Sequence, residues 1–534
     1  MKNSKISYIL ILAAISALAL SSCDSFLDTL PDNRATIDNE DKIKNLLTSA
    51  YPGNTYVLVT ETMSDNVDDI GPTNPHTNRF FDQLYSWTDV TETANDSPRR
   101  FWNASYASIA AANQALEAIE AIGGTTTTTL NECKGEALLC RAYNYFMLVN
   151  MFCNHYNSAT SEKDMGVPLI DKPETKLVVR YNRGTVAEVY KQIDKDIQEA
   201  LPLIGDEHLS ILKYHFNTQA AYAFASRFYL FYEQWDKAIE YATLCLGTNS
   251  KTMLRDWDYL ASMPQGDAGR QAIEEHFISA DVNANLLLAT ATSYAGVAFN
   301  PYWDLSRYAH SAYLAENEDI SAENVWGREG YRLKPAVYSA TNMDMTIMWR
   351  IPYLFEYTDP VARKGYVHTV IPLLTADECL LNRAEAYIIK KQYDKATADI
   401  NLWLSNILSE APMLTTQDII EFYNAADYSY GDEEGLAGTV KKHLHPAFAI
   451  DAEGSEQESM LQCVLGIRRI ETLHLGLRWF DIKRYGIEII RRQLGPNGKP
   501  LIATDVLKKD DPRRAIQLPE EVIKAGLPAN PRNK

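Results

Sequence analysis

The chain of 534 residues carries 70 acidic and 51 basic side chains, which gives a formal net charge of −19. A surface this acidic repels nucleic acid, because binding DNA or RNA needs clustered Lys and Arg, so that class of function is excluded. Hydrophobic residues make up 46% of the chain, which is enough for a large core. Length alone suggests several domains, although a helical repeat array could form one continuous body.

The first 22 residues have the composition of a signal peptide. Lys2 and Lys5 form a short basic start, and residues 6–20 are almost entirely apolar. That apolar segment is about 15 residues long, which is too short to span a bilayer comfortably but suits the core of a signal peptide. The sequence LSSC at positions 20–23 resembles a lipobox, the pattern recognised by lipoprotein signal peptidase. We therefore predict cleavage before Cys23.

Cys23 is the predicted lipidation site, because its thiol can take a diacylglyceryl group. If the amino terminus is acylated as well, the anchor would be stable, because stable attachment to a membrane needs more than one acyl chain. An ordinary signal peptide with an incidental cysteine is the alternative. With Cys23 lipidated, residues 23–45 would form a lipid-anchored N-terminal segment. No later segment reaches about 18 uninterrupted apolar residues, so we expect the rest of the chain to be water-soluble.

Six cysteines follow Cys23, and none of them belongs to a CxxC pair. Most lie in apolar sequence of helical character, such as EALLCRAYNYF, which favours buried free thiols over a disulfide framework. These residues are Cys133, Cys140, Cys153, Cys245, Cys379 and Cys463.

Amphipathic helices dominate the first half of the chain. Apolar residues from Ile109 to Ile119 mark one face of a helix that should end at Gly123 and Gly124. The sequence TLNE at 129–132 reads as a capping box that opens a second helix over roughly 131–152. GVPLIDKP at 166–173 predicts an extended connection, and a further helix is expected over 185–201, before Pro202.

One internal repeat points to a known kind of helical scaffold. ASRFYLFYEQWDKAIEYA, which begins at Ala225, aligns with RAEAYIIKKQYDKATADI, which begins at Arg383, so that Tyr229 matches Tyr387. A helix with small and aromatic residues, a short turn, and Asp-Lys-Ala opening a second helix is typical of tetratricopeptide hairpins. Two copies fall short of an array, but the helices near 104–152 could supply further hairpins.

Three stretches, 52–100, 248–375 and 409–460, contain Gly, Pro, Asn, Asp and scattered aromatic residues without a sustained period. Irregular segments of this length in a compact protein are usually functional. The predicted fold class is therefore mostly α, with a tetratricopeptide-like helical hairpin scaffold, long loop-rich excursions and little strand.

The chain lacks the common catalytic motifs HExxH and GxSxG, the P-loop, and EF-hand spacing. His443 and His445 could bind a metal, but a solvated pair is favoured because no third ligand is apparent. The acidic run SDNVDD at 64–69 could hold calcium, and here too a solvated loop is the favoured interpretation. A hydrolase is disfavoured, and no cofactor is predicted.

The sequence IRRIETLHLGLRWFDIKRYG at 467–486 resembles the signature of the SusD/RagB family of outer-membrane nutrient-binding lipoproteins. The departures are Ile467 and Leu475, where the family usually has glutamate, and Leu477, where histidine is frequent. Further segments match in the family's order: SFLD after the lipobox, FWNASYASIAAANQAL, GEALLCRAYNYFMLV, GVPLI, ECLLNRAEAYI and DPRRAIQLPEEVIKAGLPANP. The signature residues that match are Arg468, Glu471, Gly476, Arg478, Trp479, Phe480, Asp481, Lys483 and Arg484.

The resemblance implies a fold with four tetratricopeptide-like hairpins, a single domain over 46–534, and a ligand-binding loop-rich face built from about 52–100 and 248–375. It also implies a SusC-like TonB-dependent transporter as partner and a place on the outer membrane, exposed at the cell surface. Within the signature, Arg478 and Asp481 can pair with neighbouring elements while Trp479 and Phe480 pack inward. We expect these residues to hold the fold rather than to touch ligand.

Glycan binding needs exposed aromatic faces with amide or guanidinium groups beside them. Two breaker-rich loops offer this combination, and the resemblance implies that ligand aromatics come from these regions. The alternative for each aromatic is that it anchors its loop to the scaffold. Trp102 and Trp235 fit helix-face patterns and are expected in the core, and Trp87, in an extended stretch, is expected to be structural. The candidate ligand residues are Asn78, Arg79, Phe80 and Phe81 in 71–83, a loop that also offers His76, and Asn300, Tyr302 and Trp303 in 296–308.

The favoured function is non-catalytic capture of an oligosaccharide and its delivery to a SusC-like TonB-dependent transporter. A RagB-type protein that captures peptides is the first alternative, and would depend on backbone pairing in a wide groove. A surface hydrolase and a helical scaffold for protein assembly are the remaining alternatives.

Overall fold

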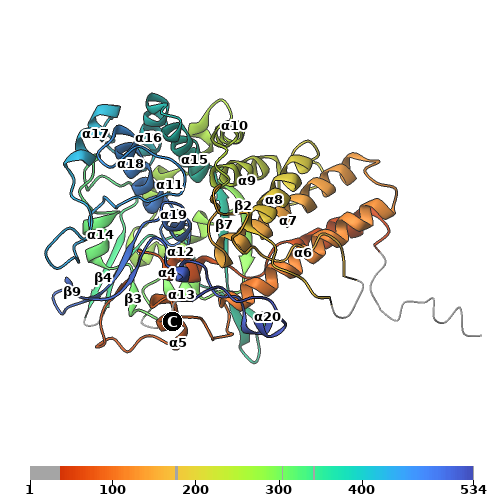
Figure 1. Ribbon diagram of the computed structural model, residues 1–534, viewed down its shortest axis with the longest axis horizontal. Coiled ribbons are helices and arrows are strands. Elements are labelled where there is room, and N and C mark those ends of the chain that lie inside the picture. Colours follow the sequence, from red (N-terminus) through yellow and green to blue (C-terminus); the bar gives the residue numbers. More distant parts are fainter. Residues whose placement is uncertain (1–36, 175–178, 303–304, 341–342, 533–534) are drawn as a thin grey trace, which may run out of the picture.

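The computed structural model describes residues 37–174, 179–302, 305–340 and 343–532. The predicted signal peptide and Cys23 lie outside these ranges. Helices dominate, and the strands form small sheets toward the lower left and the centre of the view (Figure 1). This arrangement confirms the mostly helical fold predicted from the sequence.

The scaffold consists of paired helices that pack against one another in chain order. α6 (Pro98–Ala121) packs on α7 (Thr128–Phe152), and α7 packs on α8 (Val186–Ala200). The two hairpins of the predicted repeat follow, and α10 of the first packs directly on α15 of the second (Figure 1). Their helices are α9 (Thr218–Phe231), α10 (Trp235–Leu246), α15 (Ala376–Ile389) and α16 (Tyr393–Ile407).

The turns of the two repeat hairpins are equivalent in detail. Glu233 has a φ of 59° and Lys391 a φ of 57°, so both turns use a left-handed residue at the same place. In each, the next amide closes the turn on the matched tyrosine: the N–H of Gln234 donates to the Tyr229 carbonyl, and that of Gln392 to the Tyr387 carbonyl. The sequence repeat is therefore a structural repeat.

Several helices begin directly after a residue whose side chain caps them. Ser97 caps α6, which ends just before Gly123 as predicted, and Thr185 forms a capping box with Glu188 at α8. The predicted capping box at 129–132 was wrong, because α7 begins two residues earlier with Thr127 as its cap. The Glu132 carboxylate instead accepts a hydrogen bond of 2.8 Å from the backbone N–H of His208 and lies 3.0 Å from Nδ1 of its ring.

The remaining helices lie outside these pairs. They are α3 (Glu40–Leu47), α4 (Val57–Met63), α5 (Arg79–Tyr85), α11 (Trp257–Ser262), α12 (Arg270–Phe277), α13 (Ala295–Ala298), α14 (Ala312–Glu318), α17 (Thr416–Ala425), α18 (Glu456–Glu471), α19 (Arg478–Arg484) and α20 (Glu520–Lys524). Short 3₁₀ turns occupy Thr48–Ala50, Leu212–Tyr214, Ser250–Met253, Gly266–Ala268 and Pro512–Arg514.

Strands occupy much of 285–375, a stretch whose sequence shows no sustained period. An antiparallel sheet has the order β2–β7–β6, and β4 pairs with β5 as a hairpin. A second sheet, β3–β1–β8–β9, joins segments more than 400 residues apart in sequence. The strands are β1 (Asp68–Asp69), β2 (Asn285–Ala291), β3 (Tyr308–Ala309), β4 (Ala336–Ala340), β5 (Met343–Ile347), β6 (Leu354–Asp359), β7 (Lys364–Thr375), β8 (Ile489–Leu494) and β9 (Pro500–Leu507).

The acidic run 64–69 is buried, which contradicts the solvated loop predicted for it. Asp65 makes two hydrogen bonds of 2.9 Å to the guanidinium of Arg478, and Asp68 lies 3.2 Å from that of Arg492. Burial of a carboxylate is costly unless a cation and hydrogen bonds compensate for it. These arginines lie more than 400 residues away in sequence, so the local composition gave no sign of the pairing.

The signature residues hold the fold, as predicted. Arg468 lies 3.1 Å from Asp481, and Arg478 reaches Asp65. Trp479 is fully buried, and Phe480 is nearly so. Gly476 has a φ of 74°, and a Cβ at this position would lie 2.4 Å from the Thr60 hydroxyl, so close packing on α4 requires glycine here.

Other predictions about the core are confirmed. The six cysteines after Cys23 are buried free thiols. Trp87 and Trp102 are buried, and the indole N–H of Trp87 donates to the Met63 carbonyl at 2.9 Å. Trp235 is half-buried and packs edge-on against Phe448. Within the described residues, no helix has the length and apolarity needed to cross a bilayer.

Candidate functional site

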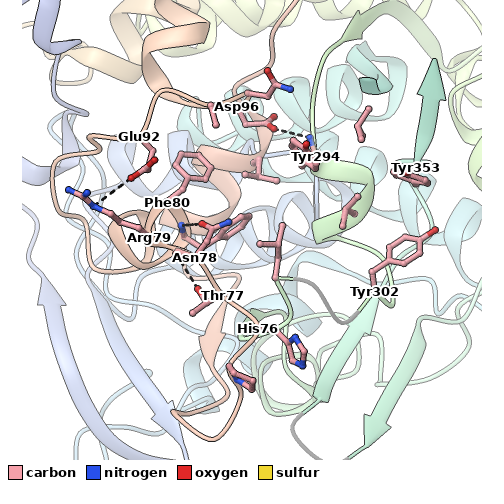
Figure 2. Close-up of a pocket in the computed structure, with 18 residues that line it drawn as sticks. His76, Thr77, Asn78, Arg79, Phe80, Glu92, Asp96, Tyr294, Tyr302 and Tyr353 are labelled. Atoms are coloured by element: carbon pink, nitrogen blue, oxygen red, sulfur yellow. Dashed lines mark hydrogen bonds and ion pairs between the residues drawn. The ribbon is translucent and has the colours of Figure 1, made fainter. Parts of the chain in front are cut away.

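A pocket of about 900 Å³ lies where the two predicted ligand loops meet (Figure 2). Residues 75–81 form one wall, and the segment that leads into α6 extends it. Residues of 294–305, with two from the β6–β7 hairpin, form the opposite wall. The lining residues are Leu58, Pro75, His76, Thr77, Asn78, Arg79, Phe80, Phe81, Glu92, Ala94, Asn95, Asp96, Tyr294, Val297, Tyr302, Leu305, Tyr353 and Val367.

The first wall is built on the start of α5. Asn78 caps this helix, because its side-chain oxygen accepts a hydrogen bond from the Phe81 N–H at 3.2 Å. Phe80 and Phe81 are 8% and 4% exposed, and their rings meet edge to face with centroids 5.5 Å apart. Arg79 is exposed at the rim and lies 3.6 Å from Glu92. The helix start therefore supplies an apolar wall with a polar edge.

Asp96 joins the two walls. Its carboxylate accepts hydrogen bonds from the Ser293 hydroxyl and, at 2.8 Å, from the Tyr294 N–H (Figure 2). Burial raises the pKa of Asp96 to about 6, against the opposing effect of these two hydrogen bonds. This contact fixes the segment before α6 against the loop that carries Tyr294, a residue that is 41% exposed.

Two tyrosines form the second wall (Figure 2). The rings of Tyr302 and Tyr353 meet edge to face with centroids 5.7 Å apart, and Tyr353 is 41% exposed. The Arg270 guanidinium lies 5.4 Å from the centre of the Tyr302 ring and donates a hydrogen bond to its hydroxyl at 3.4 Å. Arg270 thus positions Tyr302 by both a cation–π contact and a hydrogen bond.

The predicted ligand residues fall into three groups. Asn78, Arg79, Phe80, Phe81 and Tyr302 all line the pocket, and Trp303 lies outside the described residues. Asn300 is 1% exposed and lies outside the lining. Its amide donates to the carbonyls of Gly296 at 2.7 Å and Ile351 at 2.9 Å, so it positions the loop that carries Tyr302.

Sequence analysis missed several lining residues. Tyr294 lies two residues before the chosen loop 296–308, so a wider window with the same criteria would have included it. Tyr353 and Asp96 lie outside the two chosen loops, and the sequence around them did not mark them as candidates. They reach the pocket only because the β6–β7 hairpin and the start of α6 pack beside the two loops.

The geometry suits a ligand with both apolar faces and hydroxyl groups. Exposed tyrosine rings can stack on the CH face of a sugar, and carboxylate, amide and guanidinium groups at the rim can hydrogen-bond its hydroxyls. In the described parts of the chain, no three His, Cys, Asp or Glu side chains are grouped so that they could hold a metal ion.

Comparison with known proteins agrees with this fold. Residues 25–230 match the SusD-like family model described as starch-binding and associating with the outer membrane. The structure superimposes along 92% of its length on a SusD superfamily protein from Bacteroides thetaiotaomicron, covering 100% of that chain with a TM-score of 0.60 and 18% identity. The chain has the fold of the SusD superfamily.

Two further similar proteins match this chain over most of its length. SusD-like protein P2 of Formosa agariphila is 22% identical over 530 residues, which is 93% of each chain. The fold also matches a laminarin-binding SusD-like protein, with a TM-score of 0.53, 16% identity, and coverage of 92% of this chain and 99% of the other. The fold predicted from the 467–486 signature is thus confirmed.

Proposed function

We propose that this chain is a non-catalytic, lipid-anchored receptor on the cell surface that captures an oligosaccharide and passes it to a SusC-like TonB-dependent outer-membrane transporter. The observation that carries the proposal is the pocket of about 900 Å³ with Tyr294, Tyr302 and Tyr353 on its wall. Tyrosine rings held at a concave site offer stacking faces for sugar rings, and such stacking needs no catalytic group.

Two further observations support a glycan as the cargo. The matched family model is described as starch-binding, and one protein of the same fold binds laminarin. A peptide receptor would depend on backbone pairing along an open strand edge or wide groove. Side chains of loops and helix starts line most of this pocket, which favours sugar over peptide.

Calorimetry against a panel of starch-derived and laminarin-derived oligosaccharides, with mixed peptides as the comparison, tests the cargo. We expect saturable binding of at least one glycan and no binding of peptides. Mass spectrometry of the recovered ligand tests the absence of catalysis, and we expect the glycan to return at its original length. Shorter products would contradict a non-catalytic receptor, and peptide binding without glycan binding would favour the RagB-type alternative.

Replacing Cys23 by serine is expected to move the mature protein from the membrane fraction to the soluble fraction. Serine cannot take the thioether-linked diacylglyceryl group, and the anchor depends on the acyl chains. Fractionation of cells followed by immunoblotting measures the shift. The matched control is Ser25→Ala, which leaves the thiol in place and should stay with the membrane. Retention of the Cys23 variant in the membrane fraction would rule out lipid anchoring at this residue.

A further inference from the structure

The β6–β7 hairpin connects the pocket to the outside of the molecule. Tyr353, directly before β6, and Val367 of β7 both line the pocket. From there the hairpin runs outward, and the last four residues of β6 and the first three of β7 are exposed. Figure 1 shows the end of this hairpin beyond the body of the molecule, below the β7 label.

The strand register places two further aromatic residues on the pocket side of the hairpin. Phe355 is paired with Val367, and Tyr357 with Gly365. Directly opposed residues of an antiparallel pair point to the same face, and alternate residues along a strand do so too. Phe355 and Tyr357 therefore share the face of Val367, which the pocket uses as its wall.

This face is an exposed aromatic surface. The rings of Phe355 and Tyr357 meet edge to face with centroids 4.9 Å apart, and Tyr357 is 54% exposed. A Cβ at position 365 would lie 2.7 Å from Cε1 of Phe355, so glycine leaves room for that ring to lie across the hairpin. Large exposed aromatic side chains that adjoin a pocket indicate a binding surface rather than a packing element.

We propose that Phe355 and Tyr357 form an outer subsite that binds the far end of a glycan chain whose near end occupies the pocket. This inference rests on the proposed function and adds the class of ligand, a chain longer than a disaccharide. From Tyr353 to Tyr357 a strand covers about 14 Å at about 3.4 Å per residue. A disaccharide held between the tyrosines of the pocket cannot also reach Tyr357.

The hairpin itself provides a matched control. Tyr366 is 38% exposed and pairs with Glu356, so it lies on the opposite face of the same two strands. Tyr357→Ala and Tyr366→Ala thus remove the same side chain at a similar exposure from the two faces. Tyr357 lies on the face that the pocket uses, and Tyr366 does not.

The test measures affinity by calorimetry for maltose and maltooctaose, and for laminaribiose and laminarioctaose. We expect the wild-type chain to bind the octasaccharide of its preferred series more tightly than the disaccharide. Tyr357→Ala should weaken binding of that octasaccharide about fivefold, the effect of one aromatic contact, and leave the disaccharide unchanged. Tyr366→Ala should change neither affinity.

Each contrary result has a distinct meaning. Equal affinity for short and long chains, or an octasaccharide affinity that Tyr357→Ala leaves unchanged, would overturn the outer subsite while leaving glycan capture intact. Failure of the wild-type chain to bind any of the four sugars would overturn both proposals for these glycan classes. Hydroxyl-radical footprinting gives a second readout, because the octasaccharide but not the disaccharide should protect Phe355 and Tyr357.

Discussion

Replacing Glu318 by glutamine should lower the free energy of unfolding by about 3–5 kcal/mol, the usual cost of breaking a buried ion pair. Glu318 is fully buried at the end of α14, where it accepts hydrogen bonds from Lys442 at 2.6 Å, Arg492 at 2.7 Å and Arg469 at 3.1 Å. Glutamine keeps the shape but removes the negative charge, and its NH₂ group would face N–H donors. Three buried cations would then lose a shared counter-charge.

The pKa of Glu318 determines how this effect depends on pH. Burial acts to raise the pKa, but Lys442, Arg492 and Arg469 together hold it far below its usual value. A carboxyl whose folded pKa is lowered stabilises the fold above its unfolded pKa, near about 4.3, and loses that contribution as the pH falls toward the folded pKa. The stability difference between wild type and variant should therefore persist from neutral pH to about pH 5 and shrink only in strong acid.

Urea denaturation followed by circular dichroism measures this difference. Glu316→Gln is the matched control, since Glu316 is exposed on the same helix and its replacement should change stability by less than about 0.5 kcal/mol. Equal urea midpoints for the two variants would show that the buried cations do not depend on Glu318.

Alanine at Tyr302 or Tyr353 is expected to weaken glycan binding about tenfold or more in each case. Tyrosines that form the centre of a binding site commonly contribute about 2 kcal/mol or more to affinity. The two rings touch, so either replacement also removes support for the other ring. The double variant should therefore lose less than the sum of the two single losses.

Calorimetry with the preferred glycan measures these losses, and thermal unfolding confirms that the variants remain folded. Tyr259→Ala is the control, because Tyr259 is 50% exposed on α11 and does not line the pocket. Unchanged affinity in the double variant would place the ligand elsewhere on the molecule. Equal loss in the Tyr259 variant would indicate a general effect on the fold.

The helical scaffold was predictable because its signals are local. The spacing of apolar residues in α6 and the repeated Gln-Trp-Asp-Lys-Ala and Gln-Tyr-Asp-Lys-Ala turns depend on residues within a few positions of one another. Such spacing reports directly on the helix period and on turn geometry. The exact start of α7 was missed because Thr127 and Thr129 offer the same capping chemistry two residues apart.

The site was predictable only in part. The chain alone identified the loops around Phe80 and Tyr302 by their aromatic residues and breakers, and both loops line one pocket. Tyr353 joins them because β6 pairs with β7, and that pairing is set by contacts with β2 far earlier in the chain. A short apolar run such as VIPLL in β7 does not reveal its strand partners.

The sequence by itself determined the helical repeat and located the two loops that line the pocket, and it predicts a signal peptide with lipidation at Cys23. Tertiary structure alone decided that the acidic run 64–69 is buried and that Tyr353 completes the pocket. The physical reason is range: helix periods and caps depend on neighbours in sequence, whereas a buried charge such as Asp65 is stable only beside Arg478, more than 400 residues away.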